Sequence, residues 1–219
     1  MKKRIFSLFL VITLLLSALC GCGGMGLTTD GTTADTSDSV SVPENSSFAV
    51  HFIDVGQADA ALIMCKGQTM LIDGGNAEDS NLIYSYLQKQ KITHLDYVVC
   101  THAHEDHVGG LSGALTAATV GTVLAPVTDY DSKVFQNFVA KARERGREIT
   151  VPRAGDVYQV GDATVTVLGP QKTYDETNDT SIVLRVVFGK TSFLFTGDME
   201  SSAEKDLLEA GVALKSTVL

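Results

Sequence analysis

The stretch Thr101-His102-Ala103-His104-Glu105-Asp106-His107 decides how this chain folds and what it can bind. Three imidazoles and a carboxylate fall within six residues, directly after the apolar run 94–100, where loop backbone can turn them toward one point. Imidazole nitrogen and carboxylate oxygen suit Zn²⁺, and also Mn²⁺ or Fe. A core or surface position is the usual explanation of a single histidine, but three of the chain's five histidines lie here, and Gly109-Gly110 follows them. The pattern predicts a metal-binding loop.

Strands and helices alternate on both sides of this loop. Short apolar runs bounded by glycine predict strands, and apolar residues spaced by three and four predict helices. The expected strands cover 48–55, 60–65, 69–72, 94–100, 122–124, 148–151, 156–158, 163–168, 181–187, 192–196 and 214–219. The expected helices cover 79–91, 111–118, 133–145 and 201–210. The first three strands form a meander, 188–191 is a hairpin turn, and the alternation predicts an α/β fold.

The N-terminus predicts an exported protein. Met1-Lys2-Lys3-Arg4 is followed by 15 uncharged residues, from Ile5 to Leu19, which is the pattern of a signal peptide. A stop-transfer anchor is the alternative, but a bilayer-spanning helix needs roughly 20 residues. The following Leu19-Cys20-Gly21-Cys22 resembles the bacterial lipobox. Cys22 is the expected diacylglyceryl site; Cys20 competes, although Leu19 before it is bulky for the small-residue position.

Three segments follow from this reading. Residues 1–22 are a lipoprotein signal peptide with its lipobox, residues 23–47 a disordered tether rich in Ser, Thr and Asp, and residues 48–219 one folded domain. Diacylglycerol brings two acyl chains, which is what stable membrane attachment takes. The expected localisation is extracytoplasmic, with the protein lipid-anchored to the cell membrane and no stable protein partner.

The charge of the domain limits how it could bind nucleic acid, and the positions of its cysteines bear on whether it forms a disulfide. Of the net charge of −9, residues 48–219 carry −8. Proteins that bind duplex nucleic acid by bulk electrostatics are usually basic, so any nucleic-acid contact here must be local and metal-assisted. Cys65 and Cys100 lie inside apolar runs, where free cysteines behave as small buried hydrophobes; a disulfide between them is the alternative outside the cell.

The pattern His-x-His-x-Asp-His resembles the signature loop of the metallo-β-lactamase fold, which implies an αββα sandwich. The resemblance implies that His102 and His104 hold one metal and that Asp106 and His107 hold a second. It further implies that Asp198, in Phe195-Thr196-Gly197-Asp198, bridges the two ions. An aspartate after glycine can also be a plain turn residue. The implied cofactors are two divalent ions, Zn or Mn, with Asp106, His107 and Asp198 nearest the chemistry.

The resemblance is closest to the extracytoplasmic hydrolase domain of the ComEC family of DNA-uptake proteins. The matching segments are Phe52-Ile53-Asp54-Val55-Gly56-Gln57-Ala58-Asp59-Ala60, Leu71-Ile72-Asp73-Gly74-Gly75 and Phe195-Thr196-Gly197-Asp198-Met199-Glu200. Ala58 stands where that family usually has glycine, which stiffens the turn but removes no ligand. The resemblance implies that Asp73 orients the metal loop by hydrogen bonds and does not ligate.

Two departures from the family lie in the C-terminal half. Asn178-Asp179-Thr180-Ser181 occupies the place where many relatives supply a third histidine to the first metal; Asp179 or Asn178 is a tentative candidate there, and a plain turn is the alternative. The family would continue past the strand expected at 214–219 into a Gly-His-His-Gly-Ser-like segment. The sequence is therefore read as a sandwich incomplete in its C-terminal half, from a truncated gene product or a partial record.

The resemblance implies a metal-dependent hydrolase. Two metals and a bridging hydroxide would attack a phosphodiester, and single-stranded DNA is the first expected substrate. Hydrolysis of another ester or amide is the alternative, because one fold hosts many chemistries. An inactive, truncated lipoprotein is the second alternative.

Overall fold

The structure is a computed structural model that describes residues 47–219. The predicted signal peptide, the Cys22 lipidation site and all of the predicted tether except residue 47 lie outside the described residues. The strands are β1 (Phe48–Phe52), β2 (Ala61–Cys65), β3 (Gln68–Ile72), β4 (His94–Val99), β5 (Thr119–Leu124), β6 (Ile149–Thr150), β7 (Val157–Val160), β8 (Ala163–Gly169), β9 (Val183–Phe188) and β10 (Thr191–Phe195). The helices are α1 (Ser80–Lys89), α2 (Glu105–Val108), α3 (Leu111–Ala117), α4 (Lys133–Glu144) and α5 (Ser201–Glu209), with 3₁₀ turns η1 (Ala77–Asp79) and η2 (Asn178–Thr180).

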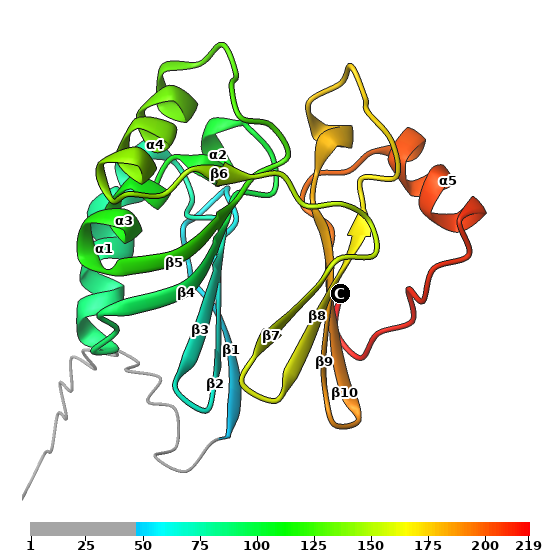
Figure 1. Cartoon of the computed structure of the whole chain (residues 1–219), viewed down its shortest axis with the longest axis horizontal. Helices are drawn as coiled ribbons and strands as arrows, with labels where there is room; N and C mark the ends of the chain where they lie inside the picture. Colours follow the sequence, from blue (N-terminus) through cyan, green and yellow to red (C-terminus); the bar gives the residue numbers. More distant parts are fainter. Residues whose placement is uncertain (1–46) are drawn as a thin grey trace, which may run out of the picture. The chain divides into compact units, whose positions relative to one another are not determined.

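Two sheets pack face to face, and helices cover both outer faces (Figure 1). Helices α1, α3 and α4 lie on one side, and α5 lies on the other. The expected αββα sandwich is confirmed. The layers form because each sheet carries apolar residues on both faces and each helix buries one apolar stripe.

The first sheet runs in the order β1-β2-β3-β4-β5-β6. Strands β1, β2 and β3 pair antiparallel, as the predicted meander requires, whereas β3 to β6 pair parallel through helical crossovers. Parallel strands end at the same edge of a sheet, so the loops that follow β3 and β4 meet there. This edge is where the metal-binding loop lies.

The second sheet runs β10-β9-β8-β7 and is antiparallel throughout. The predicted hairpin between β9 and β10 is confirmed: it turns at Gly189 and Lys190, where Gly189 has a φ of +58°. The core between the sheets joins side chains of both, including Ile63, Met70 and Val99 from the first and Val165 and Leu184 from the second.

Helices α1, α3 and α4 bury their apolar stripes on the outer face of the first sheet, with Ile83, Leu115 and Phe135 fully buried. Helix α5 covers the second sheet with Leu207, which packs on Leu168 and Val183. Cys65 and Cys100 are both free and buried, as expected of small hydrophobes.

The structure lacks one expected element and contains a helix that was not expected. The strand expected over 214–219 does not form: Val218 makes one isolated parallel bridge with Phe193, and Leu214 packs near Leu207 instead. Because only Thr217 and Val218 reach hydrogen-bonding distance of β10, the ladder stops after one step. In addition, residues 105–108 form helix α2, which is too short to give a periodic pattern. Within residues 47–219, no helix is both long enough and apolar enough to cross a bilayer.

Glycines allow the metal loop to sit directly on the end of β3. Gly74 donates its N–H to the carbonyl of His107 (2.8 Å), and Gly110 donates to Gly75 (3.2 Å). A Cβ on Gly110 would lie 1.9 Å from the Gly74 carbonyl oxygen, and one on Gly109 would lie 2.2 Å from the Ala77 nitrogen. Backbone atoms cannot yield as a flexible side chain can. The two Gly-Gly pairs are therefore a packing requirement.

We expect Gly110→Ala to lower the free energy of unfolding by about 3 kcal/mol, because the new methyl group must push two backbone segments apart. Chemical denaturation followed by circular dichroism measures the change. Asn137→Ala, on the exposed face of α4, is the control and should stay within about 0.5 kcal/mol of the parent protein. Equal stability of Gly110→Ala and the parent would contradict the close backbone packing.

Candidate metal centre

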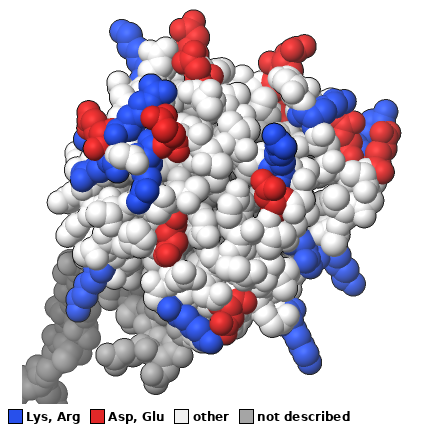
Figure 2. Space-filling model, viewed as in Figure 1, with Lys and Arg blue, Asp and Glu red and all other residues white. Residues whose placement is uncertain are grey.

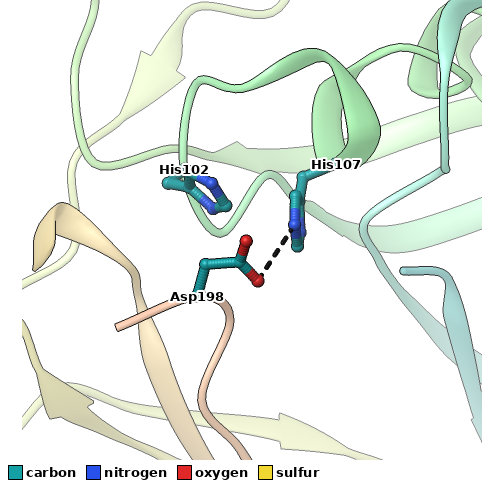
Figure 3. Close-up of side chains that lie close together, drawn as sticks. All are labelled: His102, His107 and Asp198. Atoms are coloured by element: carbon teal, nitrogen blue, oxygen red, sulfur yellow. Dashed lines mark ion pairs between the residues drawn. The ribbon is translucent and has the colours of Figure 1, made fainter. Parts of the chain in front are cut away.

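The candidate centre forms where three strand ends converge. Asp73 directly follows β3, His102 lies in the loop after β4, and Asp198 lies three residues beyond β10. His107 comes from the short helix α2. Figure 3 shows Asp198, from the loop after β10 of the second sheet, approaching the two imidazoles, which come from the loop after β4 and from α2. The site therefore joins both halves of the sandwich.

One nitrogen of His102, one of His107 and a carboxylate oxygen of Asp198 all lie within 4.8 Å of one another. His107 Nε2 is 3.2 Å from Asp198 Oδ1, and His102 Nε2 is 3.2 Å from His104 Nδ1. Two ligands at 2.0–2.1 Å on one tetrahedral zinc ion stand roughly 3.3 Å apart. The spacing of the His102 and His104 nitrogens matches that separation.

Asp73 is the buried support of this group. Its Oδ1 accepts the Thr101 N–H (2.8 Å), and its Oδ2 accepts the Thr101 hydroxyl (2.6 Å) and His107 Nδ1–H (2.9 Å). Because Nδ1 of His107 is held in this way, Nε2 is the nitrogen that faces Asp198. Thr101 was missed at the level of sequence, although its position between the strand and His102 marks it as a candidate for such bonding.

Ser181 and Gly197 place Asp198. The Ser181 hydroxyl accepts the Asp198 N–H at 3.1 Å. Gly197 has a φ of +51°, and a Cβ there would lie 2.9 Å from Ser181 Oγ and 3.1 Å from Thr101 Cβ. Glycine is thus required for both its backbone conformation and its close approach. Ser181 gave no signal in the sequence, because its role depends on a residue 17 positions away.

Two of the expected ligands lie nearby but outside the three-residue group. His104 is partly buried and reaches His102 as described. Asp106 is partly exposed, and its Oδ2 accepts a hydrogen bond from Gln57 Nε2 at 3.4 Å. The two-ion assignment of these residues stays a prediction.

Asp179 does not join the group. Its Oδ1 accepts the N–H groups of Glu200 (2.9 Å) and Ala203 (3.3 Å), so the carboxylate caps the start of α5. In place of the tentative metal-ligand role, the structure gives Asp179 this capping role. Asn178, the other candidate at this position, donates to Glu200 and leaves its Oδ1 buried without a hydrogen-bond partner.

The two buried imidazoles are held in opposite charge states in the metal-free protein. Burial, with the nearby positive charge of His107, lowers the pKa of His102 to about 3. Burial alone would lower the pKa of His107, but the hydrogen bond and charge of Asp73, helped by Asp198, raise it to about 9. His102 is therefore neutral at pH 7 and His107 is protonated.

Cys100 supports the loop without being a ligand. Its thiol donates to the carbonyl of His102 at 2.8 Å. Burial, with the charge of Asp73, raises the pKa of the Cys100 thiol well above its usual range, which disfavours the thiolate that metals bind. The candidate ligands are thus nitrogen and oxygen atoms alone.

These residues fit a divalent metal ion. The site offers a neutral imidazole, a second imidazole fixed by a buried carboxylate, and an acidic oxygen within one ligand sphere. A carboxylate on the second nitrogen of a ligating histidine is the usual support of such a site. An αββα sandwich with a histidine and aspartate centre at one edge, where loops from both sheets meet, is typical of the metallo-hydrolase class.

Comparison with known proteins gives the family. The model of the metallo-beta-lactamase superfamily matches residues 53–216. The chain belongs to this superfamily and is a metallo-hydrolase, as the sequence predicts. Members of the superfamily bind divalent metals at such sites.

The ComEC-type resemblance is also confirmed. ComE operon protein 3 of Bacillus subtilis is 26% identical over 189 residues, covering 78% of this chain and 24% of the relative. Recombination protein 2 of Haemophilus influenzae is 27% identical over 165 residues, covering 71% and 19%. The chain thus spans about a quarter or less of the length of these two curated relatives.

One solved structure supports the fold. MEM-A1, a subclass B3 metallo-beta-lactamase from a soil metagenome library, superposes with a TM-score of 0.53 at 19% identity. The match covers 78% of this chain and 75% of that one. At 19% identity this similarity supports the sandwich fold alone.

We expect Asp73→Asn to lower metal affinity about 10- to 100-fold, because the amide cannot accept from His107 and Thr101 as the carboxylate does. Isothermal titration with Mn²⁺ measures the affinity. Asp162→Asn, an exposed change remote from the centre, is the control and should bind as the parent protein does. An unchanged affinity in Asp73→Asn would show that the metal loop is held without this carboxylate.

We expect metal binding to release a proton. Below pH 9 the His107 proton competes with the metal, whereas His102 has none to lose. Affinity should therefore rise as the pH is raised from 7 toward 9, by at most about tenfold per unit. Titrations in two buffers of different ionisation enthalpy give the number of protons released. A count of zero at pH 7 would contradict the raised pKa of His107.

Proposed function

We propose that this chain is a metal-dependent phosphodiesterase or nuclease that uses two divalent ions, Zn or Mn, with single-stranded DNA as its substrate. The observation that carries the proposal is the convergence of His102, His107 and Asp198 from both halves of the sandwich. Bound divalent ions lower the pKa of water and offset the negative charge that builds on a phosphoryl group under attack. Asp179 is left out of the proposed ligand set.

In this function some residues would hold the two ions, and others would keep those ligands in position. His102 and His104 would hold the first ion, and Asp106 and His107 the second, with Asp198 between them. Asp73 keeps the Nδ1 proton of His107 in place, so that Nε2 stays directed at the centre. Thr101 fixes Asp73 in turn. Pre-organised groups of this kind need no rearrangement when the reaction begins.

The relatives support a phosphodiester substrate. Besides the ComEC-type proteins, a Ribonuclease Z of an Exiguobacterium species is 32% identical over 106 residues, covering 45% of this chain and 34% of the relative. Its name describes a nuclease. For the present chain we adopt only the reaction class of a nuclease, cleavage of a phosphodiester, and not the RNA substrate.

The charge distribution favours a second candidate, the hydrolysis of an uncharged ester or amide. Residues 48–219 carry a net charge of −8. On the face shown in Figure 2, Lys and Arg side chains are interspersed with Asp and Glu and form no continuous basic patch. A polyanion would gain little from such a surface, because phosphate neutralisation dominates nucleic-acid affinity.

The proposal places the protein outside the cytoplasmic membrane, anchored through lipid on Cys22. The support is the basic start, the apolar run and the lipobox-like segment of the sequence. Labelling cells with a radioactive or alkyne-tagged fatty acid would show whether Cys22→Ala abolishes lipidation and Cys20→Ala leaves it intact.

The function is tested by metal content together with cleavage. We expect the purified protein to bind about two metal ions per chain by elemental analysis and to cleave single-stranded DNA. His104→Ala should reduce cleavage about 100-fold or more, since the loss of one ion removes several kcal/mol of charge stabilisation. His94→Ala is the matched control, because this exposed histidine bonds Thr119 and lies outside the centre.

The outcomes separate the candidates. Metal binding with hydrolysis of an uncharged ester, and no cleavage of DNA, would move the assignment to the second candidate. Absence of bound metal in a folded protein would remove both.

A further inference from the structure

The loop between β1 and β2 contacts the metal loop, yet none of its side chains has a place in the function proposed above. The loop is closed at its base by the Ile53 N–H, which donates to the Ala60 carbonyl at 2.9 Å. Gly56, with a φ of +69°, turns the chain, and the Gly75 N–H donates to the Asp59 carbonyl at 2.9 Å. Ala58 packs on the core. The loop is therefore held at its base by two backbone hydrogen bonds and anchored to the core by Ala58.

This loop meets the metal loop at Asp106 through two hydrogen bonds. The Asp59 N–H donates to the Asp106 carbonyl oxygen at 3.2 Å, and Gln57 Nε2 donates to Asp106 Oδ2 at 3.4 Å. The first bond fixes the backbone of Asp106, and the second engages its side chain. The carboxylate of Asp59 faces the same region, with Oδ2 4.0 Å from His107 Nδ1.

The chemistry of glutamine suits the task of orienting a ligand. An amide N–H donates to a carboxylate oxygen while carrying no charge, so it adds no repulsion toward a cation. It occupies one oxygen of Asp106 and leaves Oδ1 free. The Asp106 side chain is otherwise on a four-residue helix at the surface, where a free carboxylate would sample several rotamers.

We propose that Gln57 is a positioning residue that fixes the Asp106 carboxylate toward the metal centre and thereby sets the affinity for the second ion. The part that concerns the second ion rests on the proposed two-metal function. Orientation of Asp106 by Gln57 does not depend on it and can be measured in the metal-free protein.

The test compares Gln57→Leu with Gln88→Leu. Gln88 is an exposed glutamine on α1 whose Nε2 also makes one 3.4 Å hydrogen bond, to the Ala117 carbonyl. In titration with Mn²⁺ alone, we expect Gln57→Leu to weaken the second binding step about tenfold and to leave the first unchanged. Gln88→Leu should match the parent protein in both steps. Equal weakening of both steps in Gln57→Leu would overturn the proposal, because it would indicate general loss of structure.

A double-mutant cycle shows whether Gln57 acts through Asp106. In an Asp106→Ala background, adding Gln57→Leu should change Mn²⁺ binding no further. A second tenfold loss in that background would mean that Gln57 acts by another route, and the proposal would fail.

A metal-free measurement separates this inference from the proposed function. Three-bond NMR couplings report the χ1 rotamer of Asp106, which we expect to be single in the parent protein and averaged in Gln57→Leu. If the parent protein binds only one ion, the two-metal function fails, while this measurement still decides whether Gln57 orients Asp106. A single unchanged rotamer in Gln57→Leu would overturn the positioning role.

Discussion

The buried carboxylate of Asp73 is the constraint on which the rest of the centre depends. One side chain accepts hydrogen bonds from the backbone and hydroxyl of Thr101 and from His107, and so ties the end of β3 to the end of β4 and to α2. A buried carboxylate is costly unless it is fully hydrogen-bonded. Its three donors satisfy that requirement, and the same bonds fix the imidazole that faces Asp198.

The two Gly-Gly pairs serve the same geometry. Gly74 and Gly75 follow Asp73 directly, and Gly109 and Gly110 follow α2, so the backbone after β3 lies against the backbone after α2. Precision at a metal site comes from supports of this kind, which leave the ligating atoms few alternatives. The second sheet adds only Asp198, placed by Ser181 and by the close approach of Gly197. The centre is therefore complete only when both sheets are packed together. The geometry of the ligands thus depends on the packing of the whole sandwich.

Particular elements and residues show which features could be predicted from the sequence and which could not. The histidine loop, the meander, the β9–β10 hairpin and the longer helices are local patterns, and each was predictable. Helix α2 was not, because four residues are too few to show periodicity. The expected strand at 214–219 has the composition of a strand, but pairing depends on the distance to β10, and only Thr217 and Val218 come close enough. Asp179 likewise has the chemistry of a ligand, yet it points to the start of α5, where it accepts N–H groups that have no partner within the helix.

The sequence by itself determined the α/β alternation, the donor set of the metal loop and the superfamily, because these depend on residue type and on spacings of a few positions. Only the tertiary structure decided the hydrogen bonds by which each carboxylate is held. Resemblance to the family singled out Asp73 and Asp198, but neighbouring residues alone do not fix the roles of Asp73, Asp179, Asp198 and Asp59. Asp73 supports His107, Asp179 caps α5, Asp198 is a candidate ligand, and Asp59 lies beside the centre. The first three roles differ because sheet packing brings hydrogen-bond partners 17 to 34 residues away within about 3 Å of these residues.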